Sequence, residues 1–421
     1  MKNIFFKSAL ILVSGIVFMT SCNKDLDQFP APSPQPAYPV GTGIQGKIAS
    51  TPSDSLYNRL ITRSGLAPLL NDNSRMLTMF VTNNAGMRIF INGFLAANGQ
   101  PQITSTSNNA FSDTISRFIP ASTAAAIVLY NTVGQKFLST SFPVDFPNYA
   151  LPSEFKLVPD QPFVRLPIFP SRGTPYSFVN DIPVTAFDSL ASNGVIHHTF
   201  TVVAPPSATL KTLIAAQPTL SYFRAAITRA DSGQVNLGRL DSLLNYGVTN
   251  MTVLIPNDAA FQTFIFGVAF GNAIAGGATP SQANVIATGA VAGGPAIFST
   301  SNFTTAQVRG LMAYHFLATN STGSFTPNIR VFTVNIPATP LLIRTLVNGA
   351  VAAHPGIRAQ STFTVIGAGP IAVATATTFT GLGTFPPGGA PFSSPAANVI
   401  AKDRHAVNGV YHVIDRILLP Q

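Results

Sequence analysis

Histidines are the residues of this chain best placed for chemistry, because a neutral imidazole is a common metal ligand. Two are adjacent, His197 and His198, and a third, His412, has a similar sequence context near the C-terminus. Adjacent residues of a strand point to opposite faces, so one ion cannot easily be held by the pair. No cysteine or carboxylate cluster accompanies them. We therefore predict no metal site, structural roles for His197 and His412 through ring-to-backbone hydrogen bonds, and an exposed His198.

Catalytic signatures are missing from the sequence. It contains no Gly-x-Ser-x-Gly elbow, no His-Glu-x-x-His helix, no phosphate-binding glycine loop with lysine and no cysteine nucleophile. Residues 403–405 (DRH) do not form a recognised set of catalytic residues either. Paired carboxylates for glycoside hydrolysis leave no sequence signature, so an unrecognised hydrolase stays an alternative. The prediction is a protein without catalytic residues, cofactor or enzymatic activity.

His197 and His412 each end a copy of the same short sequence motif. Residues 193–197 read NGVIH and residues 408–412 read NGVYH, each followed by an apolar run and a proline. Asn-Gly favours a tight turn, and the apolar run with its β-branched residues favours a strand. Upstream, residues 78–85 (TMFVTNNA) align with residues 252–259 (TVLIPNDA), 174 positions later. The chain is therefore predicted to hold two units of one fold.

These motifs resemble the fasciclin (FAS1) family, whose domains open with Thr-hydrophobic-x-x-Pro-Asn-x-Ala-Phe and close with Asn-Gly-Val-Ile-His and a strand. Residues 252–261 match the opening, and residues 308–317 (VRGLMAYHFL) match a middle helix that ends in Leu-x-Tyr-His. The first unit departs from the family at Thr82, Met87 and Asn131, where proline, phenylalanine and histidine are usual. The resemblance implies an α+β fold of two tandem FAS1-like domains, each a β-sandwich-like wedge edged with short helices. It marks as structural motif residues Asn193, Gly194, His197, Asn257, Asn408, Gly409 and His412.

The middle motif also suggests a site. In animal members of that family the pair equivalent to Tyr314 and His315 is linked to integrin-dependent adhesion, so the resemblance makes these two residues adhesion candidates. The alternative is structural, because Leu311 packs at helical spacing and a histidine near a helix C-terminus can bond the last carbonyls. Both interpretations stay open for the second unit, whereas the first lacks the histidine.

Domain boundaries follow from the repeat. The first domain is predicted over residues 46–208 and the second over residues 209–421. Apolar periodicity predicts helices at residues 55–61, 85–94, 121–130, 210–214, 222–229 and 237–244, and strands at residues 77–82 and 163–168. Two stretches of the second domain, residues 266–297 and 381–395, are rich in glycine with alanine or proline and are predicted to be loops packed loosely on its surface.

The N-terminus has the features of an export signal and an anchor. Lys2 and Lys7 precede an apolar stretch at residues 9–19, which is short for a membrane span, and small residues then lead to Cys22, the only cysteine. Residues 19–22 (MTSC) resemble a bacterial lipobox. We predict a lipoprotein signal peptide at 1–21, lipid attachment at Cys22, and a stiff Pro-rich linker at 22–45 that holds the domains off the membrane.

Two further patterns concern the cell surface. Residues 23–27 (NKDLD) resemble the surface-export signal of Bacteroidetes lipoproteins, with an ordinary polar linker as the alternative. An outer-membrane lipoprotein of the cell envelope, exposed outward, is therefore predicted. Four Asp-Ser/Thr-aliphatic segments fit O-glycosylation in the same bacteria, and each also suits a helix N-cap or turn. The candidate acceptors are Ser55, Thr114, Ser189 and Ser242.

Composition limits the partners. Charged residues make up 9% of the chain and hydrophobic residues 46%, and the formal charge of +9 falls to +7 without residues 1–21. The basic residues are scattered singly, which argues against nucleic-acid binding. A surface of hydroxyls and amides suits an extracellular protein or polysaccharide as partner. The predicted function is cell-surface adhesion by a membrane-anchored fasciclin-domain protein. The alternative is an accessory glycan-binding lipoprotein of an outer-membrane uptake system.

Overall fold

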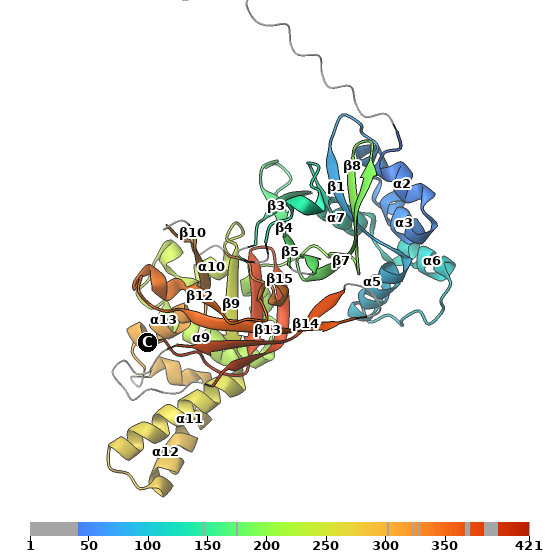
Figure 1. The fold of residues 1–421 in the computed structure, drawn as a ribbon. Helices are drawn as coiled ribbons and strands as arrows, with labels where there is room; N and C mark the ends of the chain where they lie inside the picture. Colours follow the sequence, from blue (N-terminus) through green and yellow to red (C-terminus); the bar gives the residue numbers. More distant parts are fainter. Residues whose placement is uncertain are drawn as a thin grey trace, which may run out of the picture. The chain divides into compact units, whose positions relative to one another are not determined.

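The computed structural model describes residues 41–420 except 145, 147, 174–175, 301–302, 322–323, 327–328, 367–370 and 383–394. The predicted signal peptide, Cys22 and most of the predicted linker lie outside the described residues, as does most of the stretch 381–395. Within the described part of the chain, no helix combines the length and the apolar composition needed to cross a membrane. Strands and helices occur in two successive halves, each with an eight-stranded sheet (Figure 1), which confirms the α+β prediction.

The first half begins with helices and ends with strands. Its helices are α2 (Ile44–Ser50), α3 (Ser55–Ser64), α4 (Ala67–Leu70), α5 (Asn84–Ala97), α6 (Asn108–Phe118) and α7 (Ala121–Tyr130). Its strands are β1 (Leu77–Thr82), β2 (Thr132–Val133), β3 (Leu151–Lys156), β4 (Arg165–Ile168), β5 (Pro170–Arg172), β6 (Ser177–Val179), β7 (Ile182–Ala191) and β8 (Gly194–Thr199). Helix α2 starts at Ile44, so residues 44–45 of the predicted linker belong to this helix.

The second half repeats this order. Its helices are α8 (Leu210–Ala215), α9 (Ser221–Ala230), α10 (Leu240–Asn245), α11 (Asp258–Ala275), α12 (Pro280–Ala292) and α13 (Thr305–Tyr314). Its strands are β9 (Met251–Pro256), β10 (Leu317–Ser321), β11 (Ser324–Thr326), β12 (Leu341–Thr345), β13 (Ile357–Val365), β14 (Ala372–Gly381), β15 (Ala397–Ala406) and β16 (Gly409–Ile414).

Each sheet curls back on itself. In the first half the strand order is β4-β3-β2-β1-β8-β7-β6-β5, and the two edge strands are separated in sequence by the single residue Phe169, so the two edges must meet there. In the second half β9 lies at one end of the order, and its Val253 pairs with Phe316, directly before β10 near the other end. Both halves therefore have a barrel-like sheet.

The same central pairing occurs in both sheets. Strands β1 and β8 run parallel with Leu77 opposite Gly194, and β9 and β16 run parallel with Met251 opposite Gly409. In the other pairings between named strands the partners run antiparallel. This shared pairing supports the prediction of two units of one fold.

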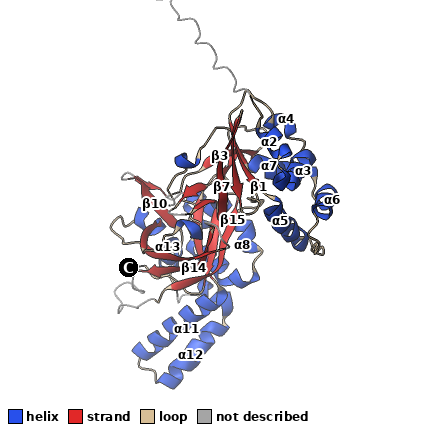
Figure 2. Cartoon of the chain, turned by 45° about the vertical axis from the view of Figure 1, so that its right-hand side comes forward, coloured by secondary structure: helices blue, strands red, loops and turns tan. Residues whose placement is uncertain are grey.

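The central strands are buried on both faces. Leu77, Met79 and Val81 pack against the helices of the first half, and Phe80 packs inside the curled sheet. Successive residues of a strand point to opposite faces, so a strand with a core on each side has a nearly continuous apolar sequence. Figure 2 shows α2, α3 and α4 gathered to one side of β1. Strand β9 has the same division, with Val253 toward the helices and Leu254 inside the sheet.

The glycine after each motif asparagine is required by the close approach of these two strands. A Cβ atom on Gly194 would lie 1.9 Å from the carbonyl oxygen of Leu77, and its φ of +154° also disfavours a side chain. A Cβ atom on Gly409 would lie 2.3 Å from the carbonyl oxygen of Met251. Only glycine lets the final strand begin directly beside the central one.

The prediction of a loop over residues 266–297 was wrong. The stretch forms most of α11 and all of α12, which lie side by side as a helical hairpin (Figure 1). Alanine is the best helix former, and a capping box of Thr279 and Gln282 fixes the start of α12. Ala283 and Ala287 are the buried residues of α12. The frequent glycines suggested a loop, but the alanines between them sustain a helix.

Two predicted boundaries also move. Strand β4 begins at Arg165, and Phe163, which was expected in that strand, is almost fully exposed. Helix α10 begins at Leu240, because residues 236–238 form a separate 3-10 turn. The predicted helices at 121–130 and 222–229 and the strand at 77–82 are confirmed.

Candidate functional site

The motif asparagines connect each final strand to the helices that begin the same half. Asn193 is fully buried; its Oδ1 accepts from Ile44 N at 2.8 Å and its Nδ2 donates to Leu70 O at 2.9 Å. Asn408 is equally buried, with Oδ1 accepting from Leu210 N at 2.8 Å and Nδ2 donating to Leu244 O at 2.9 Å. A carboxamide suits this place because it both donates and accepts.

The motif histidines join each final strand to the irregular part of the neighbouring strand, β7 or β15, and to a loop. The ring of His197 is buried; Nδ1 accepts from Asp188 N at 3.3 Å, so Nε2 carries the proton and donates to Phe137 O at 2.8 Å. In the second half, His412 Nδ1 accepts from Asp403 N at 3.1 Å and Nε2 donates to Val331 O at 2.9 Å. Both rings use both nitrogens inside the protein and offer none to a metal ion.

We call the buried motif asparagine and histidine of each half, with their hydrogen bonds, the motif frame. A threonine on the central strand also belongs to this frame in each half. Thr78 donates to Gln135 O at 2.7 Å and accepts from Phe137 N at 2.7 Å. Thr252 makes the same two bonds, to Ile329 O at 2.7 Å and from Val331 N at 2.8 Å. The first threonine of the aligned segments is therefore a hydrogen-bonded core residue.

Two aspartates belong to the frame although no sequence motif marked them. Asp188 and Asp403 have positive φ values of 56° and 53°, a left-handed conformation that aspartate tolerates better than most residues. Their carboxylates accept from the backbone N–H of Ser139 at 2.9 Å and of Thr333 at 2.8 Å. Each lies nine positions before a motif histidine, and this equal spacing was the signal available in the sequence.

The aligned asparagines cap the first helix after each central strand. Asn83 Oδ1 accepts from Gly86 N at 3.0 Å, and Asn257 Oδ1 accepts from Ala260 N at 2.8 Å. The next residue of each pair reaches another helix. Asn84 Oδ1 accepts from Leu56 N at 2.9 Å, and Asp258 Oδ1 accepts from Tyr222 N at 2.9 Å.

We expect Asn257→Ala to destabilise the second half by about 1 kcal/mol, the usual effect of removing an N-cap side chain. Asn257→Asp keeps the acceptor and should stay close to the parent protein. Urea titration followed by circular dichroism measures both. Equal midpoints for Asn257→Ala and the parent would contradict the assigned cap.

The adhesion candidates Tyr314 and His315 are fully buried. The hydroxyl of Tyr314 donates to Gly356 O at 2.6 Å and accepts from Leu382 N at 3.0 Å. His315 Nδ1 donates to Leu311 O at 2.8 Å, and Nε2 accepts from Leu418 N at 3.1 Å. A partner that binds the surface of the folded domain does not reach either side chain.

Burial sets the charge state of His315. Desolvation lowers its pKa to about 4, so the ring is neutral at physiological pH. In the first half Asn131 fills the corresponding place, where Nδ2 donates to Ile127 O at 2.9 Å and to Val203 O at 2.8 Å. Both residues join the end of a helix to the segment after the final strand. The asparagine in the first half therefore takes the same position as the histidine.

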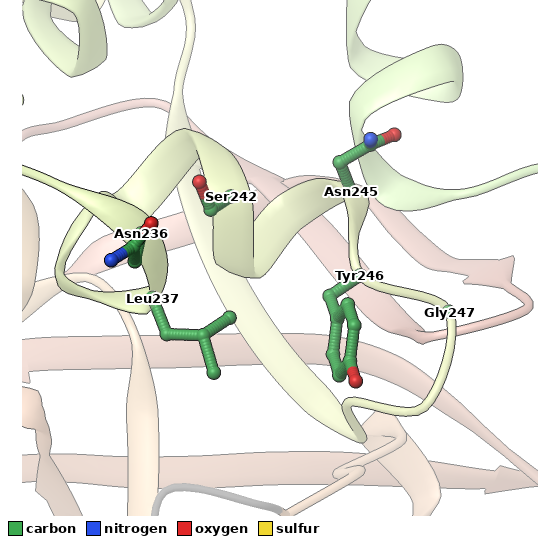
Figure 3. Close-up of a pocket in the computed structure, with 6 residues that line it drawn as sticks. All are labelled: Asn236, Leu237, Ser242, Asn245, Tyr246 and Gly247. Atoms are coloured by element: carbon green, nitrogen blue, oxygen red, sulfur yellow. The ribbon is translucent and has the colours of Figure 1, made fainter.

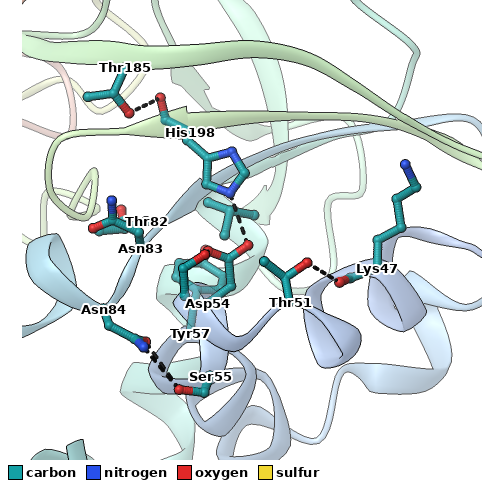
Figure 4. A network of polar contacts seen from close by, with 12 residues as sticks. Lys47, Thr51, Asp54, Ser55, Tyr57, Thr82, Asn83, Asn84, Thr185 and His198 are labelled. Carbon is teal, nitrogen blue, oxygen red and sulfur yellow. Dashed lines mark hydrogen bonds and ion pairs between the residues drawn. The ribbon is translucent and has the colours of Figure 1, made fainter. Parts of the chain in front are cut away.

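His198 is partly buried rather than exposed, with 22% of its side chain accessible. Its Nε2 lies 3.0 Å from Oδ2 of Asp54, a buried aspartate between α2 and α3, and Figure 4 shows this contact. His198 follows His197 on the strand, and the two rings have partners on different segments, as expected for opposite faces of a strand. Among the described residues, no group of three or more His, Cys, Asp or Glu side chains is arranged to hold a metal ion.

The O-glycosylation candidates lie in different environments. Thr114 is buried inside α6, and its hydroxyl donates to Ala110 O at 2.9 Å, so a glycan there is incompatible with the folded domain. Ser55 is exposed, whereas Ser189 and Ser242 are half-buried. The predicted alternative was a helix N-cap or a turn. In none of the four segments does the aspartate side chain cap a helix, whereas Asp188 has a left-handed φ of 56° inside β7.

A buried arginine lies where the two halves touch. Arg330 of the second half is fully buried, and its guanidinium carbon lies 4.9 Å from the centroid of the Phe169 ring of the first half. Its Nη1 lies 2.6 Å from Nε2 of His405, and Nη2 donates to Val407 O at 3.1 Å. Burial and this cation lower the pKa of His405 well below its usual range, so its Nε2 is an acceptor. In the sequence, the only indication of this buried arginine was its position within the apolar run of residues 329–332.

A depression on the second half gathers polar and aromatic side chains that no sequence motif marked. It has a volume of about 420 Å³ and is lined by Asn236, Leu237, Ser242, Asn245, Tyr246 and Gly247. Figure 3 shows the side chains of Leu237 and Tyr246 projecting from two segments, with Ser242 on the helix between them. Tyr246 is 51% exposed and Leu237 57% exposed. The depression is therefore accessible to a ligand.

Comparisons with known proteins find similarity among solved structures. No protein-family model matches the sequence, and no curated protein matches it. Among solved structures, the chain is similar to a FAS1 domain pair from the insect cell adhesion molecule fasciclin I, with 13% sequence identity. That match covers 87% of this chain and 96% of the other, with a TM-score of 0.31. A score at this level does not by itself establish a common fold.

Proposed function

We propose that this chain is a pair of FAS1 domains that mediates adhesion at the cell surface by binding protein or polysaccharide. The observation that carries the proposal is the frame of motif residues formed twice. Asn193 with His197, and Asn408 with His412, make matching hydrogen bonds in the two halves. These residues belong to the motifs by which the sequence resembles the FAS1 family. On this proposal each half is the helix-edged wedge of that family.

The polar motif residues point to binding rather than chemistry. The histidines, threonines and asparagines of the frame direct their polar atoms to internal backbone groups. A polar group that is hydrogen-bonded to the internal backbone stabilises the fold and is not available to contact a substrate. Recognition would then belong to exposed side chains on the rigid scaffold, where binding residues commonly lie. Tyr314 and His315 would support this scaffold from inside.

The proposed location is the outer face of a Gram-negative envelope. Cys22 would carry the lipid, and residues 23–43 would space the domains from the membrane. Several acyl chains anchor a protein firmly, since each buried methylene contributes about 0.8 kcal/mol. The alternative, an accessory glycan-binding lipoprotein of an uptake system, is favoured by the uncharged depression that contains Tyr246.

Attachment of cells tests the proposal. Cells that produce the full chain should adhere to surfaces coated with matrix protein or polysaccharide, and external protease should remove both the protein and the adhesion. Cys22→Ser should leave the protein unlipidated and abolish attachment while the purified variant stays folded. Unchanged attachment after deletion of the gene would refute adhesion. A growth defect on one polysaccharide with normal attachment would favour the alternative.

A further inference from the structure

We infer that the depression around Tyr246 is a binding site for a neutral polysaccharide, an inference that rests on the proposed function and names its ligand class. The lining residues are asparagine, serine, tyrosine, leucine and glycine, and none is charged. Ligand pockets commonly combine apolar and aromatic walls with a few polar groups that fix orientation. A sugar ring matches such a surface, because it has an apolar C–H face and a rim of hydroxyls.

The aromatic and aliphatic side chains would form the stacking surface. Tyr246 and Leu237 are more than half exposed, and Figure 3 shows both projecting into the open space of the depression. The Tyr246 side chain has no hydrogen bond or ring contact with another described residue. A rigid ring with few rotatable bonds gives a large contact area at a small entropic cost.

Polar groups flank this surface. Asn236 and Ser242 lie beside Leu237, and neither side chain forms a hydrogen bond with a described residue. An asparagine amide has two donor hydrogens and an acceptor oxygen, and a serine hydroxyl both donates and accepts. These groups can therefore bond neighbouring sugar hydroxyls in either direction. Asn245 lies at the far rim with its side chain turned away from the Tyr246 ring.

The backbone under Tyr246 is fixed by the motif frame. Its carbonyl oxygen accepts from Asn408 Nδ2 at 3.1 Å and from Thr249 Oγ1 at 2.9 Å, and its N–H donates to Ser242 O at 2.9 Å. At the other side, Asn236 has a left-handed φ of 51°, which asparagine tolerates. A preorganised platform loses little entropy on binding, which favours affinity.

The charged side chains beside the depression lie near groups of opposite charge, and Asp231 faces both Arg239 and Arg309, an arrangement that favours a neutral ligand. Arg239 Nε lies 3.9 Å from Asp231 Oδ2, and Asp241 Oδ2 accepts from Lys211 Nζ at 2.7 Å. Arg239 and Asp241 are the charged residues between the lining residues Leu237 and Ser242 in the sequence. Because these charged groups are paired, the polar contacts with a ligand would come from the amide and hydroxyl groups of the lining residues.

The site is particular to the second half. The position equivalent to Tyr246 in the first half is Asp72, because Asn193 Nδ2 contacts Asp72 O at 3.3 Å as Asn408 contacts Tyr246 O. The Asp72 carboxylate accepts from Ser74 N at 2.9 Å and so closes a local turn. The duplicated frame therefore presents an aromatic ring in one half and a self-bonded carboxylate in the other.

Surface plasmon resonance of the purified full chain on immobilised dextran, galactomannan and xyloglucan tests the site, with heparin as an anionic comparison. We expect binding to at least one neutral polysaccharide. Tyr246→Ala should weaken it at least about tenfold, because the stacking surface is lost, and Tyr246→Phe should stay within about threefold. Tyr149→Ala is the matched control, because Tyr149 is 63% exposed on the first half, and it should bind like the parent chain. Circular dichroism verifies that each variant is folded.

Other outcomes would overturn the inference. Equal binding by the folded Tyr246→Ala variant, or binding to heparin alone, would place recognition elsewhere and leave the proposed adhesion intact. Absence of binding to the neutral polysaccharides would also overturn the site. If cells that carry the protein still attached, the proposed function would survive, and if attachment were absent as well, both would fail.

Discussion

Asn408→Ala is expected to lower the free energy of unfolding of the second half by about 4 kcal/mol. The side chain is fully buried, and its removal takes the hydrogen-bond partner from Leu210 N–H and Leu244 O and one of the donors from Tyr246 O, which keeps Thr249. A buried polar group that loses its hydrogen bond costs about 1–3 kcal/mol. These groups come from two separate places in the chain, so loss of the side chain loosens the start of α8 and the turn after α10 together.

Two further variants isolate the cause. Asn398→Ala removes an exposed asparagine of β15 that bonds Asp415, and it should cost less than about 1 kcal/mol. Asn408→Asp retains an acceptor for Leu210 N–H but turns a carboxylate toward two carbonyl oxygens, so it should be at least as harmful as alanine. Urea titration followed by circular dichroism gives the energies, and hydrogen exchange should locate faster opening at residues 210–215. A midpoint for Asn408→Ala equal to that of Asn398→Ala would contradict the assigned role.

Acid is expected to destabilise the second half through His315. Burial lowers the pKa of this ring from its ordinary value of 6.5 to about 4. The unfolded chain therefore takes up the proton first as the pH falls, so stability is complete above pH 6.5 and is lost progressively toward pH 4. Between pH 7 and pH 4.5 this single group accounts for a loss of about 2 kcal/mol.

His315→Asn separates this effect from general acid lability, because asparagine is the residue at the corresponding position of the first half. The amide of Asn131 bonds Ile127 O and Val203 O there, so the variant should fold. We expect its urea midpoint to fall less than that of the parent between pH 7 and pH 4.5. His198→Asn is the control, since His198 is partly exposed and its loss should leave most of the acid sensitivity. An unchanged pH dependence in His315→Asn would refute the assignment.

Local patterns predicted much of the frame. The strand at residues 77–82, the helix at residues 121–130 and the two Asn-Gly turns follow from apolar periodicity and turn chemistry, which act over a few neighbouring residues. The motifs repeated in the same order predicted two units, because similar sequence segments favour the same local structure. The helical hairpin of α11 and α12 was missed, since glycine is a turn signal whose effect the surrounding alanines outweigh.

Tertiary contacts decided the residues that the local patterns left open. Asp188 and Asp403 look like ordinary turn residues until the fold brings Ser139 and Thr333 to their carboxylates. Arg330 could have been a surface cation, and only the meeting of the two halves encloses it against Phe169. Tyr314 and His315 look like a recognition pair in sequence, and the curled sheet buries them.

The sequence by itself determined that the chain is duplicated, that it has a mixed α+β fold and that its motif histidines follow tight turns. Those features depend on residue order within short segments. The tertiary structure alone decided which polar groups are used internally and which remain for a ligand. Asn408 and Tyr246 lie 162 residues apart, and no local pattern relates them. Their contact exists because the final strand returns to the central strand, and with it the asparagine reaches the turn that displays Tyr246.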